Sequence, residues 1–423
     1  MLATVQAAAS QHVELPACSA LIRRALKHPH LRHYNRLIAL IAISNLVLLA
    51  YSLTRGQWWH SHGIALNSIA IVGEANFALA IVFRQQHVIN LLHWLATRAP
   101  STWSLRLRWA LGKVYHFGGV HVGAAMSGTL WHLLFVGALT CEEVQGHHSV
   151  SIGNVIVSYA SVALFGIIVI MTSPSLRASA HNSFEMTHRF CGWAAVVVIW
   201  ANTVLFVSSQ RGHDSLARAL LTAPTIWLLL VITTSIALPW LQLRKVPVTI
   251  ERPSAHVALV ALNHWVKPSV GSIRAISRNP LREWHSFATV PASIGYPGGY
   301  RIVISRAGDW TGEFIDNPPK HVWVRGIHLI ASKVPAQLVW ATRSPRKTYG
   351  DALVDEILAV APHATIWNTD QHGKPDLVSL AYAADASFGA EAVICISNKK
   401  VTWQVVHALE RRGIPAFGPI WDS

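Results

Sequence analysis

KVYHFGGVHVGAAMSGTLWHLLFVGALT, from Lys113 to Thr140, is the stretch around which the chain is organised. It is apolar enough to cross a bilayer, yet it carries His116, His121 and His132. A second apolar stretch, SFEMTHRFCGWAAVVVIWANTVLFV, holds His188 near its start. Imidazoles are costly among lipid tails, so we expect these rings to face the interior of a helix bundle.

Composition supports a chain that lies partly in lipid. Of 423 residues, 52% are hydrophobic and only 13% are charged, and the mean hydropathy is +0.35. The net charge of +15 comes largely from Lys and Arg beside the apolar stretches, where they contact lipid headgroups. It therefore predicts membrane lipids as partners and no nucleic acid. The four cysteines lack CxxC spacing, which argues against a zinc site.

Six apolar segments reach or approach the length that a membrane-spanning helix needs. Basic residues flank the first, gather in the second connection and follow the sixth, which predicts an integral membrane protein with both termini in the cytoplasm. The segments are Asn35–Leu53, Gly63–Phe83, Val114–Leu139, Ile152–Thr172, Phe184–Val207 and Leu220–Leu241.

The composition changes after Lys245. Short β-branched runs separated by Pro, Gly and Asn predict an antiparallel barrel over 246–330. Alternating strand and helix patterns over 331–423 predict a small parallel α/β domain. The predicted organisation is thus a cytoplasmic segment 1–34, a helical membrane domain 35–245, the barrel and the α/β domain.

Two histidines from two membrane helices are the ligands that a haem iron with two axial imidazoles needs. The third and fifth segments both start at the cytoplasm, so His121 or His116 should lie near the depth of His188. We predict one haem b between His121 and His188. His132 would suit a second haem, but the fifth segment offers Asn202 at that depth. The alternative is that these histidines hydrogen-bond between helices, which we favour for His116 and His132.

The run PLREWHSFATVP, from Pro280 to Pro291, completes a family resemblance. Together with YHFGGVHVG, SFEMTHRFCGW, SRAGDWTGEF and RRGIPAFGPIWDS, it resembles the ferric reductase and NADPH oxidase superfamily, most closely its Tmp-type transmembrane flavoproteins. The resemblance implies FAD on the barrel. The residues it would place at the flavin or its pyrophosphate are His285, Ser286, Phe287, Arg301 and Arg325.

The sequence departs from that family at several positions. Ser286 replaces the usual Pro, and no glycine-rich turn lies between VWVRGI and AQLVWAT, where backbone amides would hold a dinucleotide's phosphates. NAD(P)H is therefore doubtful as the donor. Without the family, WHSF is an aromatic barrel strand.

The resemblance implies a flavohaem oxidoreductase. It would pass electrons from a cytoplasmic donor through flavin and haem b to a small-molecule acceptor across the membrane. The alternative is a non-catalytic membrane protein whose degenerate reductase domain acts in interaction or sensing.

Overall fold

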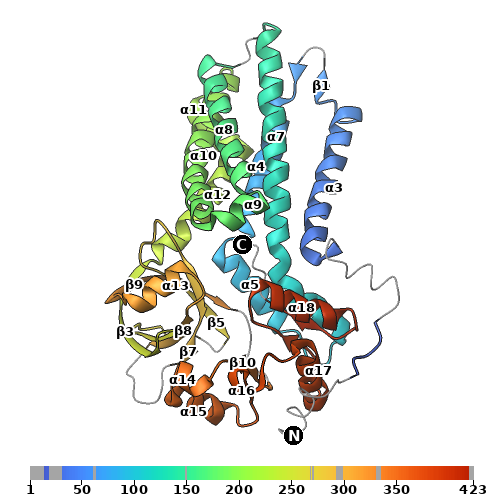
Figure 1. The fold of residues 1–423 in the computed structure, drawn as a ribbon. Helices are drawn as coiled ribbons and strands as arrows, with labels where there is room; N and C mark the ends of the chain where they lie inside the picture. Colours follow the sequence, from blue (N-terminus) through green and yellow to red (C-terminus); the bar gives the residue numbers. More distant parts are fainter. Residues whose placement is uncertain are drawn as a thin grey trace.

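A computed structural model gives the arrangement of the chain (Figure 1). The residues it describes are 14–18, 31–60, 63–147, 150–266, 268, 271–291, 299–329 and 335–418. A bundle of long helices lies at one end, and a β-sheet and a group of short helices lie at the other.

Among the residues that the structure describes, five helical segments are long and apolar enough to cross a membrane, or up to six if one bent pair counts as a single span. The helices of the bundle and its connections are α3 (His33–Thr54), α4 (Leu66–Val82), α5 (Gln86–Thr97), α6 (Leu105–Leu111), η2 (Gly112–Phe117), α7 (Gly118–Val144), α8 (Ile152–Met171), α9 (Pro174–Ser179), α10 (His181–Gln210), α11 (Leu216–Thr222) and α12 (Pro224–Leu241).

Helix α4 covers most of the second predicted span, Gly63–Phe83; it is 17 residues long, and after it the chain turns by 64° into α5. The reason lies at Gln85, whose side chain accepts hydrogen bonds from the backbone N–H groups of His87 and Val88, at 2.5 and 3.2 Å. A side-chain acceptor at this position caps a new helix and starts it in a new direction.

Helices α3 and α7 approach closely at Gly119. A Cβ atom there would collide with the carbonyl oxygen of Tyr34 and would lie 3.2 Å from Cβ of Leu37. Further along the same contact, Asn45 Oδ1 accepts from Trp131 Nε1 at 2.8 Å and from Asn76 Nδ2 at 2.9 Å. The lack of a side chain at Gly119 therefore lets α3 and α7 pack closely, and the hydrogen bonds of Asn45 join α3 to α4 and α7.

We expect Gly119→Ala to destabilise the bundle by about 1–3 kcal/mol, because its methyl group has to push α3 away. Gly137 is the matched control on the same helix, since a Cβ atom added there would have no neighbour within 4 Å. Gly137→Ala should be neutral or stabilise by up to about 1 kcal/mol. Thermal unfolding followed by circular dichroism measures both; equal melting temperatures would contradict the close approach.

The sheet has seven strands in the order β6-β5-β9-β3-β4-β8-β7, with every neighbouring pair antiparallel. Its edge strands β6 and β7 are separated along the chain only by Thr289, so the sheet curls into a partial barrel. The strands are β3 (Arg244–Ser254), β4 (Val257–Leu262), β5 (Ser272–Ser277), β6 (His285–Ala288), β7 (Val290–Pro291), β8 (Tyr300–Ser305) and β9 (His321–Leu329).

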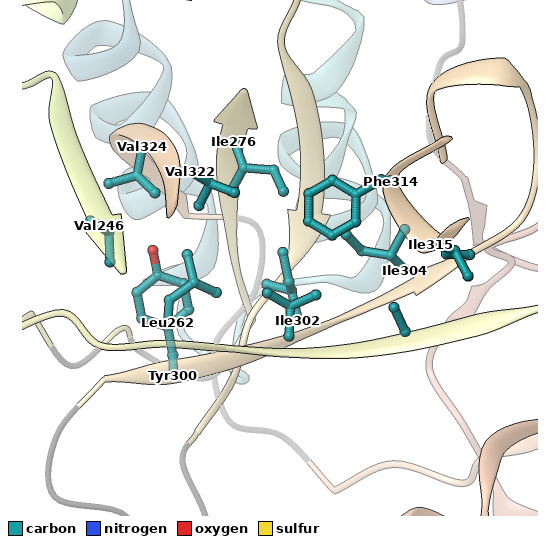
Figure 2. Close-up of a cluster of buried hydrophobic side chains, with 12 residues drawn as sticks. Val246, Leu262, Ile276, Tyr300, Ile302, Ile304, Phe314, Ile315, Val322 and Val324 are labelled. Carbon is teal, nitrogen blue, oxygen red and sulfur yellow. The ribbon is translucent and has the colours of Figure 1, made fainter. Parts of the chain in front are cut away.

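Helix α13 (Asp309–Asp316) supplies Phe314 and Ile315 to the core of this partial barrel. Figure 2 shows both beside Ile302 and Ile304 of β8, and all four are at most 1% exposed. Strand alternation explains the pattern, because Tyr300, Ile302 and Ile304 are buried while the residues between them are not.

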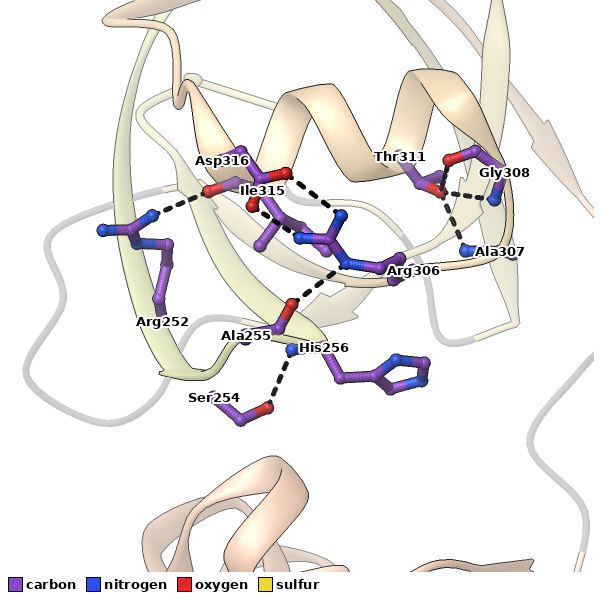
Figure 3. Close-up of polar contacts among 10 residues, drawn as sticks. All are labelled: Arg252, Ser254, Ala255, His256, Arg306, Ala307, Gly308, Thr311, Ile315 and Asp316. Atoms are coloured by element: carbon purple, nitrogen blue, oxygen red, sulfur yellow. Dashed lines mark hydrogen bonds and ion pairs between the residues drawn. The ribbon is translucent and has the colours of Figure 1, made fainter.

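Polar contacts fasten α13 to the sheet (Figure 3). Arg306 donates to both carboxylate oxygens of Asp316, at 3.0 and 2.5 Å, and from Nε to the carbonyl of Ala255 at 3.1 Å. Arg252 donates to the carbonyl of Ile315 at 2.9 Å. These bonds hold the helix against the β3–β4 hairpin.

The last part of the described chain has two separate parallel strand pairs, not the one parallel sheet expected. β10 (Val339–Thr342) pairs with β11 (Thr365–Asn368), and β12 (Val393–Ile394) pairs with β13 (Ala416–Phe417). The pairs are only four and two residues long, so they do not merge. The helices around them are α14 (Pro345–Tyr349), α15 (Asp351–Val360), α16 (Thr369–His372), α17 (Leu377–Phe388) and α18 (Lys399–Glu410).

Two ion pairs join this C-terminal part to the connection before α7. Lys113 of η2 pairs with Glu410 of α18, and Arg108 of α6 pairs with Glu391. The first is buried, with side chains 7% and 15% exposed, whereas the Glu391 side chain is 62% exposed. The Phe417 ring packs against the ammonium of Lys113, whose nitrogen lies 4.8 Å from the ring centroid.

Candidate functional site

The structure brings together His121 of α7 and His188 of α10, the two residues predicted to hold a haem. Their ring centroids lie 6.4 Å apart and their planes are inclined by 78°. Nδ1 of His121 lies 2.9 Å from the carbonyl oxygen of Ala80 on α4. A carbonyl only accepts, so Nδ1 carries the hydrogen and Nε2 of the neutral ring is an acceptor.

His116 and His132 lie elsewhere. His116 belongs to η2, one turn before α7, and its ring contacts Tyr115 at 4.3 Å and His33 at 5.9 Å between centroids. His132 bonds to Ser161 of α8, with 2.6 Å between Nε2 and Oγ. For His132 this is the interhelical hydrogen bond that we preferred.

The predicted flavin strand is β6. His285 stacks on Trp310 of α13 with 3.9 Å between centroids, and Phe287 lies 6.1 Å from the same indole. Ser286 points the other way and is exposed, as strand alternation requires. His285 and Phe287 thus pack against α13, which is the arrangement of an aromatic barrel strand.

The two arginines predicted at a pyrophosphate have protein partners. Arg301 forms an ion pair with Glu356 of α15. The guanidinium carbon of Arg325 lies 4.1 Å from the centroid of the Trp284 ring. Burial, together with nearby Arg189, lowers the pKa of Arg325 to about 10, with Glu185 acting in the opposite direction. Arg325 therefore stays cationic at neutral pH.

The start of α10 contacts the segment between β5 and β6. His181, Glu185 and Arg189 are spaced four residues apart and so lie along one face of the helix. His181 Nε2 is 3.5 Å from Glu185 Oε1, and Arg189 donates to the carbonyl of Leu281 at 2.6 Å. This seam joins α10 to the segment before β6 by that hydrogen bond, and to His285 of β6 and Arg325 of β9 by electrostatic interactions with His181, Glu185 and Arg189.

A pH dependence arises at this seam. Burial lowers the pKa of His285 below its ordinary 6.5, His181 lowers it further, and Glu283 acts in the opposite direction. The unfolded chain then binds the proton more tightly, so this stability is complete above pH 6.5 and falls as the pH drops below it. We expect His285→Phe, which keeps the stack on Trp310, to flatten that fall. Thermal melts over a pH series measure the fall in stability. The same slope of melting temperature against pH in the variant and the parent would contradict the prediction.

A polar row on α8 was not predicted from the sequence. Asn154, Ser158 and Ser161 are fully buried, and Asn154 Nδ2 and Ser158 Oγ both donate to Oδ1 of Asn202 on α10, at 2.7 and 3.1 Å. Their spacing of four and three residues, in an otherwise apolar segment, was the available signal. Within the part of the chain that the structure describes, no group of three or more His, Cys, Asp or Glu could hold a metal ion.

Comparisons with known proteins give a different family from the predicted one. Residues 325–423 match a family model described as the C-terminal domain of Adenylate-forming reductase 03009. Two proteins of Coprinopsis cinerea, Adenylate-forming reductases 03009 and 06235, are 36% and 34% identical to this chain over 95% of its length. The chain is similar to adenylate-forming reductases. It spans 41% of the length of each of these two relatives.

A solved structure adds little. An intact type IV self-sufficient cytochrome P450 monooxygenase matches with a TM-score of 0.30 and 11% identity, over 47% of this chain and 29% of that one. A likeness at this level supports no argument about fold or function.

The relatives overturn several predictions. The assignment to the ferric reductase and NADPH oxidase superfamily is wrong, and so is the flavohaem electron-transfer function; the non-catalytic alternative is not supported either. The predicted cofactors haem b and FAD are wrong. The argument against NAD(P)H is also removed, because it rested on the pattern of that family. Only reductase activity in general agrees with the relatives' names.

The predicted fold class is wrong for the same reason as the predicted family. A six-span ferric-reductase-like domain with a ferredoxin-reductase-like barrel is replaced by a mixed helix and sheet protein with a partial barrel. The physical reason is that an apolar helix with a histidine, or a strand reading WHSF, specifies local structure only. Many proteins can share such short features.

Proposed function

We propose that this chain forms the C-terminal, membrane-embedded part of an adenylate-forming reductase and takes part in its reductive step. The observation that carries the proposal is the extent of the similarity. It runs through the helical bundle as well as the sheet, because the alignments cover 95% of this chain. The family match at 325–423 supports placing the chain at the C-terminal end of such a protein.

The location in a membrane is supported by the surface of the bundle. Along α8, Ile156 and Ile170 are each 64% exposed, and Val197 of α10 is 68% exposed. Large apolar surfaces of this kind need a covering, and lipid tails provide it. The basic residues before α3, around α5 and after α12 then lie on the cytoplasmic side.

The electron donor that we propose is NADPH, bound after β10 and β11. Ligands of parallel sheets bind beyond the carboxyl ends of the strands. There the backbone N–H of Ser344 donates to Oδ1 of Asn368 at 3.0 Å, and its hydroxyl donates to Asp370 at 2.8 Å. These loops belong to the segment that matches the reductase family. The electron acceptor would be a small molecule, the adenylated substrate.

Exchange of the matching portion of Adenylate-forming reductase 03009 for this chain tests the proposal. We expect the chimera to reduce a carboxylic acid that the parent accepts, with ATP and NADPH, and a truncated parent lacking the portion to fail. A truncated parent that reduces the acid as fast as the chimera would overturn it.

Membrane location is tested separately. The chain expressed alone should stay with membranes during alkaline carbonate washing and be released by detergent. Release by carbonate alone would contradict an integral location while leaving the chimera result to judge the reductive role.

A further inference from the structure

The inside of the helix bundle contains a small cavity that the proposed function does not use. It has a volume of about 20 Å³ and lies between α4, α7, α10 and α12. Most of its lining is apolar. The polar side chains that line it are Glu74, His132, Asn202, Thr203 and Thr225. A space of this size holds one water molecule, provided that two to four polar groups bind it.

Glu74 has an open hydrogen-bonding position at this cavity. Its side chain is buried, with 7% of the residue exposed. Oε1 accepts a hydrogen bond from Thr203 Oγ1 at 2.8 Å, whereas Oε2 is buried without a hydrogen-bond partner. Neither Lys nor Arg lines the cavity, and His132 is the other titratable group there. A carboxylate left in this position would be costly, whereas a protonated carboxyl needs only an acceptor.

His132 offers that acceptor. Its Nε2 bonds to Ser161 Oγ, and the same hydroxyl lies 2.6 Å from the carbonyl oxygen of Ser158. The carbonyl can only accept, so the single hydroxyl hydrogen goes to Ser158. Nε2 of His132 must then donate to Ser161, which leaves Nδ1 of the neutral ring as an acceptor.

Asn202 offers a donor on another side. Its Oδ1 accepts from Asn154 Nδ2 and Ser158 Oγ, and this fixes the orientation of its amide. The NH₂ group of Asn202 therefore has hydrogens to give. The cavity thus combines a carboxyl hydroxyl, a ring nitrogen that accepts and an amide that donates.

We propose that this cavity binds one water molecule and one exchangeable proton shared between Glu74 and His132. At rest the proton is on Oε2 of Glu74, which donates to the water, and the water donates to Nδ1 of His132. When Oε2 gives its proton to the water and the water passes one to Nδ1, a carboxylate and an imidazolium form with no change in net charge. The site is a proton store inside the bundle, separate from the His121–His188 pair.

Infrared spectroscopy of the purified full chain in lipid nanodiscs tests this. We expect an absorption band of a protonated carboxyl group that shifts when H₂O is replaced by D₂O. Glu74→Gln should remove the band. Thr203→Val should shift it without removing it, because Oε1 loses its hydrogen bond. His132→Phe should shift it as well, because the water loses its acceptor.

Glu142→Gln is the matched control on the same bundle. Oε1 of Glu142 accepts from the backbone N–H of Ile64 at 3.0 Å, and Oε2 lies 3.1 Å from Nδ1 of His147. Both oxygens of Glu142 are thus satisfied, so its loss should leave the band unchanged. A band absent from the parent protein, or retained in Glu74→Gln, overturns the proposal. If Glu74→Gln fails to fold, an unshifted band in Thr203→Val overturns it equally.

Discussion

Glu410→Ala is expected to lower the free energy of unfolding of the C-terminal part by about 3 kcal/mol, because it leaves a buried ammonium group without its counter-ion. Lys113 is 6% exposed and pairs with Glu410 across the contact between η2 and α18. The carbonyl of Ala416 at 3.3 Å and the rings of Trp109, Tyr115 and Phe417 also lie near the ammonium, but none of them carries a negative charge to neutralise it. Limited proteolysis should then cleave α18 faster, while the bundle stays resistant.

Glu391→Ala is the matched control at the same contact. Its partner Arg108 reaches water, and the Glu391 side chain is 62% exposed. Exposed ion pairs contribute about 0–1 kcal/mol, so this variant should be cleaved almost as slowly as the parent. Equal sensitivity of the two variants would show that burial of Lys113 does not matter to the docking of α18.

Local structure could be predicted from the sequence wherever one periodicity ran long enough. The apolar run around His121 gave α7, and the alternation of Tyr300, Ile302 and Ile304 gave β8. The bend between α4 and α5 could not be predicted from hydropathy. The bend depends on one side chain, Gln85, whose hydrogen bonds start α5. The sequence around it mixes apolar and polar residues, so its hydropathy shows no break at that point.

The candidate site also has a part that the sequence could predict and a part that it could not. The sequence placed His121 and His188 at similar heights in two apolar segments, and in the structure their ring centroids lie 6.4 Å apart. The roles given to Arg301 and Arg325 did not follow from the chain alone. Their partners, Glu356 and Trp284, come from contacts 55 and 41 residues away along the chain. Sequence patterns within one element do not contain such contacts.

The family could not be read from short motifs, and the reason is again physical. Two facing histidines indicate that two helices lie close together, but they do not show which cofactor, if any, binds between them. The similarity to adenylate-forming reductases instead extends over 95% of this chain, far beyond any one motif.

Phe314→Ala should cost about 3–5 kcal/mol of folding free energy, because it removes a whole aromatic side chain from a packed core and leaves a cavity. Phe314 is fully buried in the core of the partial barrel. The centroid of its ring lies 5.1 Å from that of Trp310 on the same helix. The polar contacts of Arg306 with Asp316 would persist, so α13 would stay near the sheet with its core face emptied. Denaturant unfolding followed by tryptophan fluorescence measures the loss.

Phe388→Ala at the end of α17 is the comparison, since that ring is 37% exposed and its removal should cost less than about 1 kcal/mol. A small loss in Phe314→Ala would mean that the curled sheet holds its shape without α13. A large loss means that the sheet depends on the helix inserted into it. Its seven strands alone would then not fix the seam to α10, and the positions of His285 and Arg325 at that seam would depend on a phenylalanine of α13, 29 and 11 residues from them along the chain.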